Sequence, residues 1–247
     1  MDTMEKLTLG AMKLGLHLSP EQVGQFQTYY ENLTDWNQRI NLTAIIEYEE
    51  VQIKHFLDSL TIIPALRLRV QKILRIIDVG TGAGLPGVPL KIMFPEIELT
   101  LLEAKAKKAT FLNHLKNALG LNDIEIVPSR AEDMAQQSQY REKFDIVLSR
   151  ALASLPTLVE LTLPFCSVGG CFVAQKKGDI QAEIRQANRA INLLGGTMQE
   201  MKRVELAELA EERWLIIIDK ISPTPPQYPR RPGIPSKRPL LDKQNRQ

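Results

Sequence analysis

The stretch IIDVGTGAGLPGVPLKIMF, residues 76–94, restricts the fold more than any other part of the chain. A β-branched run ends at Asp78, and glycines follow at Gly80, Gly82 and Gly84. Glycines at such a turn allow tight backbone dihedrals and let a ligand lie against bare backbone. Because ligands of open parallel sheets bind beyond the carboxyl ends of the strands, this turn predicts a nucleotide-type ligand.

Around this turn, short β-branched or leucine-rich runs alternate with helical patterns, which is typical of a parallel sheet with helices on both faces. The expected strands cover residues 73–79, 97–102, 124–127, 144–148 and 171–174. The expected helices cover residues 88–94, 107–119, 155–163 and 180–194. Two more strand-like runs, 197–203 and 213–221, have no strong helix between them, so the last strand is predicted to be antiparallel.

The chain is predicted to have three parts. Helical periodicity is expected throughout the N-terminal helical region, residues 1–69, with a capping-box signature at Ser19 to Gln22 and a helix over residues 49–60. The sheet domain is expected to span residues 70–221. Residues 222–247 form a proline-rich tail with six basic residues and one acid, a formal charge of +5 in a chain of +2. This tail is either a basic arm that contacts phosphates or a solvated, disordered segment.

Composition excludes several classes of protein. Cys166 and Cys171 are too few for a disulfide framework, and the nearby Gly169-Gly170 predicts a turn between two reduced thiols. No window approaches the roughly 18 apolar residues needed to span a bilayer. The first residues, MDTMEKLTLGAMKLG, lack the basic-then-apolar order of a secretory signal. We therefore expect a cytoplasmic protein.

Three nucleotide-type ligands can be compared at the glycine turn. A P-loop requires Lys-Ser/Thr after its last glycine; Gly82 and Gly87 have the right spacing, but that pair is missing. A dinucleotide site requires G-x-G-x-x-G, and Leu85 stands where the third glycine should be. S-adenosylmethionine has no pyrophosphate, which suits a region where Pro86 and Pro89 remove amide donors.

Acidic residues also follow the next two expected strands. Glu103 ends the second strand, where a carboxylate can accept hydrogen bonds from both ribose hydroxyls of an adenosine. Ala131 and Glu132 follow the third strand, where an adenine edge would lie. In this order, the residues favour an adenosine cofactor, and S-adenosylmethionine is the predicted one.

The chain resembles the bacterial 16S rRNA guanine-N7 methyltransferases, also called glucose-inhibited division protein B. The resemblance covers nearly the whole chain and rests on WNQRINLTAI, HFLDSL, DVGTGAGLPGVPL, KKATFL, RAED, FDIVLSRAL and YPRRPGIPSKRPL, which occur in the family's order. This sequence differs from the family pattern at AQKKGD, residues 174–179, where the family often has Leu-Lys-Gly. This departure leaves open which of Lys176 and Lys177 takes the family role.

The resemblance implies a Rossmann-like class I S-adenosylmethionine-dependent methyltransferase that acts on 16S rRNA, in the small ribosomal subunit or an assembly intermediate. No obligate protein partner and no metal are expected. The implied cofactor contacts are Gly80, Leu85, Ala131, Glu132 and Arg150, with Asp78 orienting the loop or the methionine amine. Gly82 and Gly84 line the same loop, and Glu103 is assigned to the ribose from its strand position.

The expected chemistry requires no general base. Guanine N7 carries an in-plane lone pair, so its methylation removes no proton beforehand. Enzymes that methylate exocyclic amines usually have an Asn/Asp-Pro-Pro-aromatic motif after the fourth strand, where this chain has LSRAL, residues 148–152.

Arg150 is predicted either to orient the substrate or the cofactor carboxylate, or to form a salt bridge capping the strand. His55 and Asp58 are expected to be structural; if they are functional, they hold the helical region against the sheet or contact RNA.

RNA phosphates are expected to be bound by basic and aromatic residues near these motifs. The candidates are Lys107, Lys108, Lys176, Tyr228, Arg230, Arg231, Lys237 and Arg238. Three other functions remain open: a methyltransferase for a small metabolite, a non-catalytic RNA-binding assembly factor, and a nicotinamide-dependent reductase. A metabolite enzyme would not need the basic tail.

Overall fold

The computed structural model describes residues 3–63, 66, 74–209 and 211–242. These residues form a seven-stranded sheet with the order β3-β2-β1-β4-β5-β7-β6. The strands are β1 (Arg75–Val79), β2 (Glu98–Leu102), β3 (Ile124–Val127), β4 (Phe144–Arg150), β5 (Cys166–Lys177), β6 (Gly196–Val204) and β7 (Arg213–Lys220). All pairs from β3 to β5 are parallel, whereas β7 is antiparallel to both of its neighbours. The predicted fold class, including the antiparallel last strand, is confirmed.

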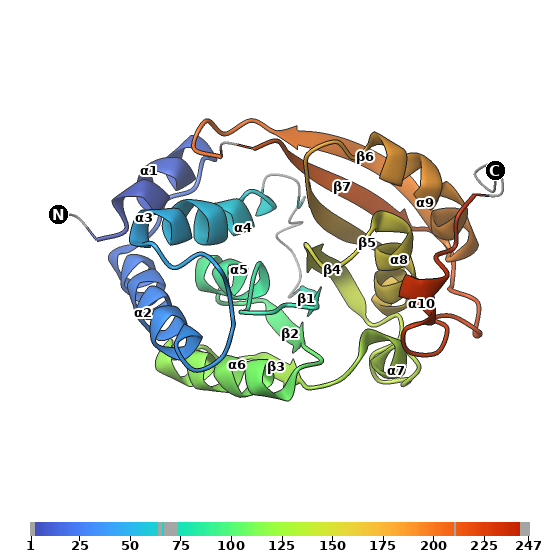
Figure 1. Ribbon diagram of the computed structural model, residues 1–247, viewed down its shortest axis with the longest axis horizontal. Coiled ribbons are helices and arrows are strands. Elements are labelled where there is room, and N and C mark those ends of the chain that lie inside the picture. The colour runs from blue at the N-terminus through green and yellow to red at the C-terminus, as the bar shows by residue number, and fades with distance from the viewer. Residues whose placement is uncertain (1–2, 64–65, 67–73, 210, 243–247) are drawn as a thin grey trace.

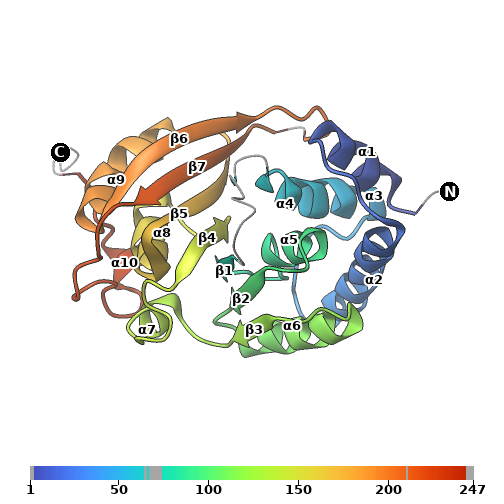
Figure 2. The same cartoon turned by 180° about the vertical axis from the view of Figure 1, so that it is seen from behind.

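Helices cover both faces of the sheet. They are α1 (Glu5–Lys13), α2 (Pro20–Asn37), α3 (Tyr48–Val51), α4 (Asp58–Leu60), α5 (Gly87–Met93), α6 (Ala106–Ala118), α7 (Ala131–Met134), α8 (Leu155–Thr162), α9 (Gln181–Leu193) and α10 (Ile234–Lys237). Figure 1 shows α1 to α6 on one side of the sheet and α7 to α10 on the other, and Figure 2 shows the same division from behind. β1 and β4 are buried on both faces, which explains their nearly continuous apolar sequences.

Each face of the sheet has its own apolar core. The core beneath α1 to α6 joins Phe26 and Phe56 of the N-terminal helical region to Leu148 of β4. The core on the other face joins Phe172 of β5 to the tail residue Leu240, which is buried. The N-terminal helical region and the tail are therefore both anchored to the sheet, one on each face.

The N-terminal helical region is less regular than its sequence suggests. The capping box is confirmed, because the Ser19 hydroxyl accepts from the Gln22 amide and the Gln22 side chain accepts from the Ser19 amide. The expected helix over residues 49–60 is a π-helical segment (Gln52–Leu57) between α3 and α4. Residues 41–47 are not helical, so the expectation of helix throughout was wrong there. In that loop the Asn37 side chain accepts from two backbone amides and takes the place of helical hydrogen bonds.

The expected turn between the two cysteines is also wrong. Cys166 and Cys171 belong to the same strand, β5, which contains a bulge between them. Phe144 pairs with Cys166, but Ile146 pairs with Cys171, so the strand carries extra unpaired residues against β4. A Cβ on Gly170 would lie 2.5 Å from a backbone oxygen of β4, so this close approach requires glycine.

The tail is ordered as far as residue 242, so the disordered alternative is excluded for residues 222–242. The Arg141 guanidinium donates hydrogen bonds to the backbone carbonyls of Thr224, Pro225 and Tyr228. Glu160 of α8, whose side chain is fully buried, accepts hydrogen bonds from the backbone and guanidinium of Arg230. The basic residues 243 and 246, and the expected boundary between residues 69 and 70, lie outside the described residues.

Candidate functional site

The glycine turn forms a loop at the carboxyl end of β1. Gly80, Gly82 and Gly84 have φ angles of +73°, +63° and +97°, which favour glycine over other residues. Cβ atoms on Gly80 or Gly84 would clash with neighbouring side chains at 2.7–2.8 Å, whereas one on Gly82 would meet only the Lys108 ammonium, 3.9 Å away. Gly82 therefore exposes its backbone to open space. That is the property expected of a surface on which a ligand lies.

Asp78 organises this loop from below. The side chain is 1% exposed, and its Oδ2 atom accepts hydrogen bonds from the Thr81 hydroxyl (2.7 Å) and the Gly87 amide (2.9 Å). Its Oδ1 atom is buried and has no partner among the described residues. Burial raises the pKa of Asp78 to about 6, against the lowering effects of its hydrogen bonds and of Arg150. A buried acceptor without a donor suits a cationic amine from a ligand.

The loop is also supported from α2, by a residue that the sequence analysis missed. Tyr29 is fully buried, and its hydroxyl donates a 2.6 Å hydrogen bond to the carbonyl of Ala83. Burial raises the pKa of Tyr29, so the hydroxyl keeps its proton and remains a donor. The signal was present in the sequence, because Tyr29 is three residues beyond Phe26 on the apolar face of the helix.

Glu103 lies at the end of β2, beside the same loop. Its Oε2 atom accepts from the Gly82 amide (3.0 Å), and its Oε1 atom accepts from the Lys105 amide (2.8 Å). These bonds fix the carboxylate next to the open backbone of Gly82. A carboxylate has about four acceptor positions, so both oxygens can still accept from ligand hydroxyls.

Ala131 and Glu132 begin α7, shortly after the end of β3. The Glu132 side chain is 9% exposed, and its Oε1 atom accepts from the Gly233 amide of the tail (2.9 Å). Glu132 thus ties the tail to the sheet edge that carries the glycine loop. Sequence spacing did not indicate this contact.

Arg150 ends β4 and points toward the N-terminal helical region. Its Nη1 atom donates to the Asp58 carboxylate (2.9 Å) and to the Lys54 carbonyl (3.3 Å). The structure therefore contains the salt bridge that was one of the two expectations for Arg150. Its charge lowers the pKa of Asp78, which places it within electrostatic reach of the glycine loop. Its role as an orienter stays a prediction.

The residue after Arg150 starts a short loop that reaches the glycine loop. Ala151 has a φ of +53°, in the left-handed region that non-glycine residues rarely adopt. Leu152 follows, 41% exposed, and its side chain lies where a Cβ on Gly80 would be. The carboxyl ends of β1 and β4 are therefore in contact through these two loops.

His55 is buried in the π-helical segment. Its Nε2 atom lies 2.8 Å from the Thr43 hydroxyl, and burial lowers the pKa of His55 to about 4. The ring is neutral at pH 7 and links the irregular loop of residues 41–47 to the helix. The contacts of His55 are those of a structural residue.

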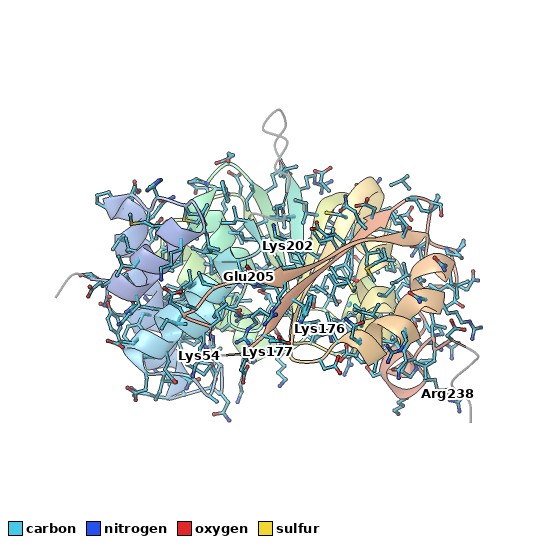
Figure 3. All side chains as sticks on the ribbon, turned by 90° about the horizontal axis from the view of Figure 1, so that it is seen from above. Lys54, Lys176, Lys177, Lys202, Glu205 and Arg238 are labelled. Carbon is cyan, nitrogen blue, oxygen red and sulfur yellow. The ribbon has the colours of Figure 1, made fainter. Side chains whose placement is uncertain are left out.

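The RNA candidates separate into two groups. Lys176 and Arg230 form ion pairs, Lys176 with Glu183 (2.7 Å) and Arg230 with Glu160 (2.6 Å). Lys176 also donates to the Ala153 carbonyl of the loop after β4. Lys107, Arg231, Lys237 and Arg238 are exposed, Lys108 is partly exposed, and Tyr228 packs against the core of the α8 face. Figure 3 shows Lys54, Lys176, Lys177 and Arg238 toward the same side of the molecule.

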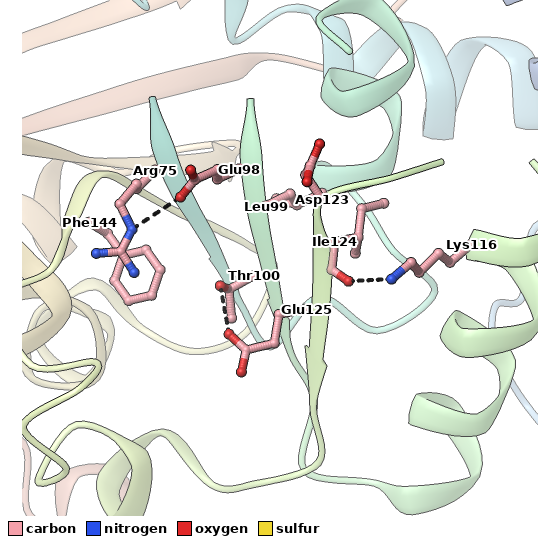
Figure 4. Close-up of a pocket in the computed structure, with 9 residues that line it drawn as sticks. All are labelled: Arg75, Glu98, Leu99, Thr100, Lys116, Asp123, Ile124, Glu125 and Phe144. Atoms are coloured by element: carbon pink, nitrogen blue, oxygen red, sulfur yellow. Dashed lines mark hydrogen bonds and ion pairs between the residues drawn. The ribbon is translucent and has the colours of Figure 1, made fainter. Parts of the chain in front are cut away.

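A hollow of about 320 Å³ lies elsewhere, at the amino ends of the strands. Its lining includes Arg75 and Glu98, the first residues of β1 and β2. Figure 4 shows Arg75 paired with Glu98, and Lys116 bonded to a backbone carbonyl. The hollow is at the opposite end of the strands from the glycine loop, so it is not part of the site around that loop.

Within the described ranges, no group of three or more His, Cys, Asp or Glu residues could hold a metal ion. The helices of that part of the chain include none long and apolar enough to cross a membrane.

Comparisons with known proteins agree on one family. Residues 22–212 match the family model described as rRNA small subunit methyltransferase G. A ribosomal RNA small subunit methyltransferase G of Dehalococcoides mccartyi (strain CBDB1) is 52% identical over 238 residues, which are 96% of this chain and all of the relative. One of the same name from Alkaliphilus metalliredigens (strain QYMF) is 45% identical over 240 residues, 97% of this chain and all of the relative.

Solved structures share the fold at low sequence identity. A mutant of MtNAS in complex with S-adenosylmethionine has a TM-score of 0.55 at 13% identity, covering 89% of this chain and 78% of that one. The precorrin-6y C5,15-methyltransferase of Geobacter metallireducens GS-15 has a TM-score of 0.51 at 14% identity, covering 73% and 92%.

Proposed function

Because the chain belongs to the rRNA small subunit methyltransferase G family, we propose that it methylates N7 of a guanine in the 16S ribosomal RNA of the small subunit. It is an S-adenosylmethionine-dependent rRNA methyltransferase. We further propose that the enzyme acts in the cytoplasm, and that its functional parts are residues 1–69, 70–221 and 222–247.

The unpaired Oδ1 atom of Asp78 is the observation that carries the proposed cofactor site. It lies below a loop whose Gly82 backbone faces open space, and Glu103 stands beside that backbone. An amino acid joined to an adenosine fits this arrangement, because the amine can donate to Asp78 and the ribose hydroxyls can donate to Glu103. We assign Ala131 and Glu132 to the adenine, and Leu85 and Gly80 to the methionine part.

The residues of the site hold and align groups, and none of them removes a proton. S-adenosylmethionine, when bound, supplies an electrophilic methyl group on a sulfonium. Guanine N7 has a free in-plane lone pair, so alignment with that methyl group is the main catalytic requirement. Arg150 is assigned to orient an anionic group of the cofactor or the RNA.

Exposed or partly exposed cations beside the carboxyl edge of the sheet are proposed to contact RNA phosphates. They are Lys107, Lys108, Arg231, Lys237 and Arg238. Arg230 and Lys176 are assigned instead to hold the tail and the loop after β4, because their charges are paired with Glu160 and Glu183. Duplex RNA hides its major groove, so the target guanine must be offered from a loop or an opened base.

The test is methylation of defined ribosomal particles. Small subunits and deproteinised 16S rRNA that lack this modification are incubated with the enzyme and labelled S-adenosylmethionine, and the product is mapped by N7-specific strand cleavage. We expect one cleaved guanine, in at least one of the two substrates. Labelling of the RNA without N7 cleavage would refute the N7 assignment. Cofactor binding without any RNA labelling would refute the rRNA function and favour a metabolite enzyme or an assembly factor.

A further inference from the structure

Asp58 is a buried carboxylate shared between two arginines. It is 2% exposed, and its Oδ2 atom accepts from Arg150 at 2.9 Å while its Oδ1 atom accepts from Arg213 at 3.0 Å. Removing charges from water is costly, so such a cluster persists only with close, well-satisfied contacts. Nothing in the sequence indicated Arg213, which is 155 residues from Asp58.

The contacts of Asp58 join three strand ends to one helical turn. Arg150 is the last residue of β4, and Arg213 is the first residue of the antiparallel β7, so both lie at the carboxyl edge of the sheet. Gln175 of β5, paired with Arg150 in the sheet, donates from its Nε2 atom to the Asp58 carbonyl (2.7 Å) and to the Thr61 hydroxyl (3.2 Å). The carboxylate therefore has a fixed backbone and two fixed partners.

The two arginines are not equivalent. Arg213 is 5% exposed, and its Nη1 atom donates to Glu211, so it is committed to this network. Arg150 uses only Nη1 in contacts with the described residues, and its Nε and Nη2 donors have no partner there. Arg150 is also the member whose charge acts on Asp78 of the glycine loop. Asp58 thus holds one end of Arg150 and leaves the remaining donors free.

We propose that Asp58 is a positioning residue that aims Arg150 at an oxyanion in the active site, with Arg213 as its anchor. This inference rests on the proposed function. The oxyanion is either the carboxylate of the cofactor or a phosphate of the RNA, and both suit the fork of donors that a guanidinium presents. Holding the arginine in one conformation beforehand avoids the entropy cost of ordering it on binding.

The test is a double-mutant cycle on Asp58→Asn and Arg150→Met. Affinity for S-adenosylhomocysteine is measured by calorimetry, and kcat and KM for RNA methylation are measured with the ribosomal substrate. If the oxyanion is the cofactor carboxylate, Asp58→Asn should weaken cofactor affinity by about tenfold. If the oxyanion is an RNA phosphate, Asp58→Asn should instead raise the KM for RNA by about tenfold. The double variant is expected to be no weaker than Arg150→Met alone, because Asp58 acts through Arg150.

The control is Glu208→Gln. This change breaks the ion pair between Glu208 and Lys13 of α1, which also joins a carboxylate to the N-terminal helical region. It should leave cofactor affinity and RNA KM unchanged. If Asp58→Asn fails to fold, the same cycle is run with Arg213→Gln, which frees the Oδ1 atom of Asp58, and a smaller but equally coupled loss is expected.

Two results overturn the proposal. One is that Asp58→Asn keeps cofactor affinity and RNA KM within about twofold of wild type. The other is that Asp58→Asn causes as large a loss in the Arg150→Met background as it does in the wild type. Wild-type enzyme that binds no cofactor and methylates no RNA would instead refute the proposed function. The two failures are therefore distinguishable.

Discussion

Replacing Gly82 by valine tests the cofactor site most directly, because the chain contains a matched control. Gly82 and Gly120 both have φ angles of +63°, and a Cβ added to Gly120 would meet no atom within 4 Å. At either position a side chain must adopt a left-handed backbone, which costs about 2 kcal/mol. For a chain of this size, that cost lowers the melting temperature by about 4–8 °C. Both variants should fold and be similarly destabilised.

Only the Gly82 side chain would enter the proposed cofactor site. At Gly82 the nearest atom to an added Cβ is the Lys108 ammonium at 3.9 Å, so the protein itself leaves room for the side chain. The valine methyl groups then occupy the space assigned to the ligand. We expect S-adenosylmethionine affinity to fall at least about 100-fold, equivalent to about 2.7 kcal/mol, in Gly82→Val.

The assay combines calorimetric titration of S-adenosylmethionine with thermal denaturation of the wild type and both variants. Gly120→Val should bind the cofactor with wild-type affinity despite its lower melting temperature. Unchanged affinity in Gly82→Val would refute the placement of the ligand over this backbone. An equal loss of affinity in both variants would show that destabilisation, rather than steric exclusion, caused the effect.

Two further predictions concern charge. Burial raises the pKa of Asp78 to about 6, so the folded state binds more protons than the unfolded state between about pH 4 and 6, and this carboxyl lowers stability as the pH rises through that window. Asp78→Asn has no such carboxyl. In urea denaturation without cofactor, the free energy of unfolding of Asp78→Asn minus that of wild type should therefore increase by up to about 3 kcal/mol from pH 4 to pH 7. The same difference at pH 4 and at pH 7 would contradict this prediction. In the tail, Arg231→Ala should reduce the slope of log RNA affinity against log salt by about 0.7–0.9 without changing the melting temperature. Arg230→Met should instead lower the free energy of unfolding by about 3 kcal/mol, because it leaves Glu160 buried and unpaired. A smaller salt slope in Arg230→Met together with a lower stability in Arg231→Ala would refute this division of roles.

Local patterns predicted the sheet well. The apolar runs that became β1 and β4 are buried on both faces and bounded by turn residues or polar residues, so their sequences alone were sufficient. The capping box at Ser19 depends on residues three positions apart and was likewise readable. The bulge of β5 was not, because the backbone oxygen that excludes a side chain at Gly170 comes from β4.

The contacts of the site show the same limit. Asp78, Gly82 and Glu103 follow strand ends in the expected order, so their neighbourhood could be inferred from strand order. The partners of Asp58 and Glu160 could not, because they are brought together only by the tertiary fold. A partial signal existed for Glu160, since a single acid within LPTLVELTLPF requires a cation when that helix is buried.

The pairing of Glu160 with Arg230 has a genetic consequence. The last tenth of the coding sequence completes the covering of α8 and supplies the only cation that, among the described residues, is paired with this buried acid. A stop codon or frameshift there removes structural material from the sheet domain rather than a dispensable arm. Such an allele should therefore have the phenotype of a gene deletion, and its loss of methylation would carry no information about RNA contacts.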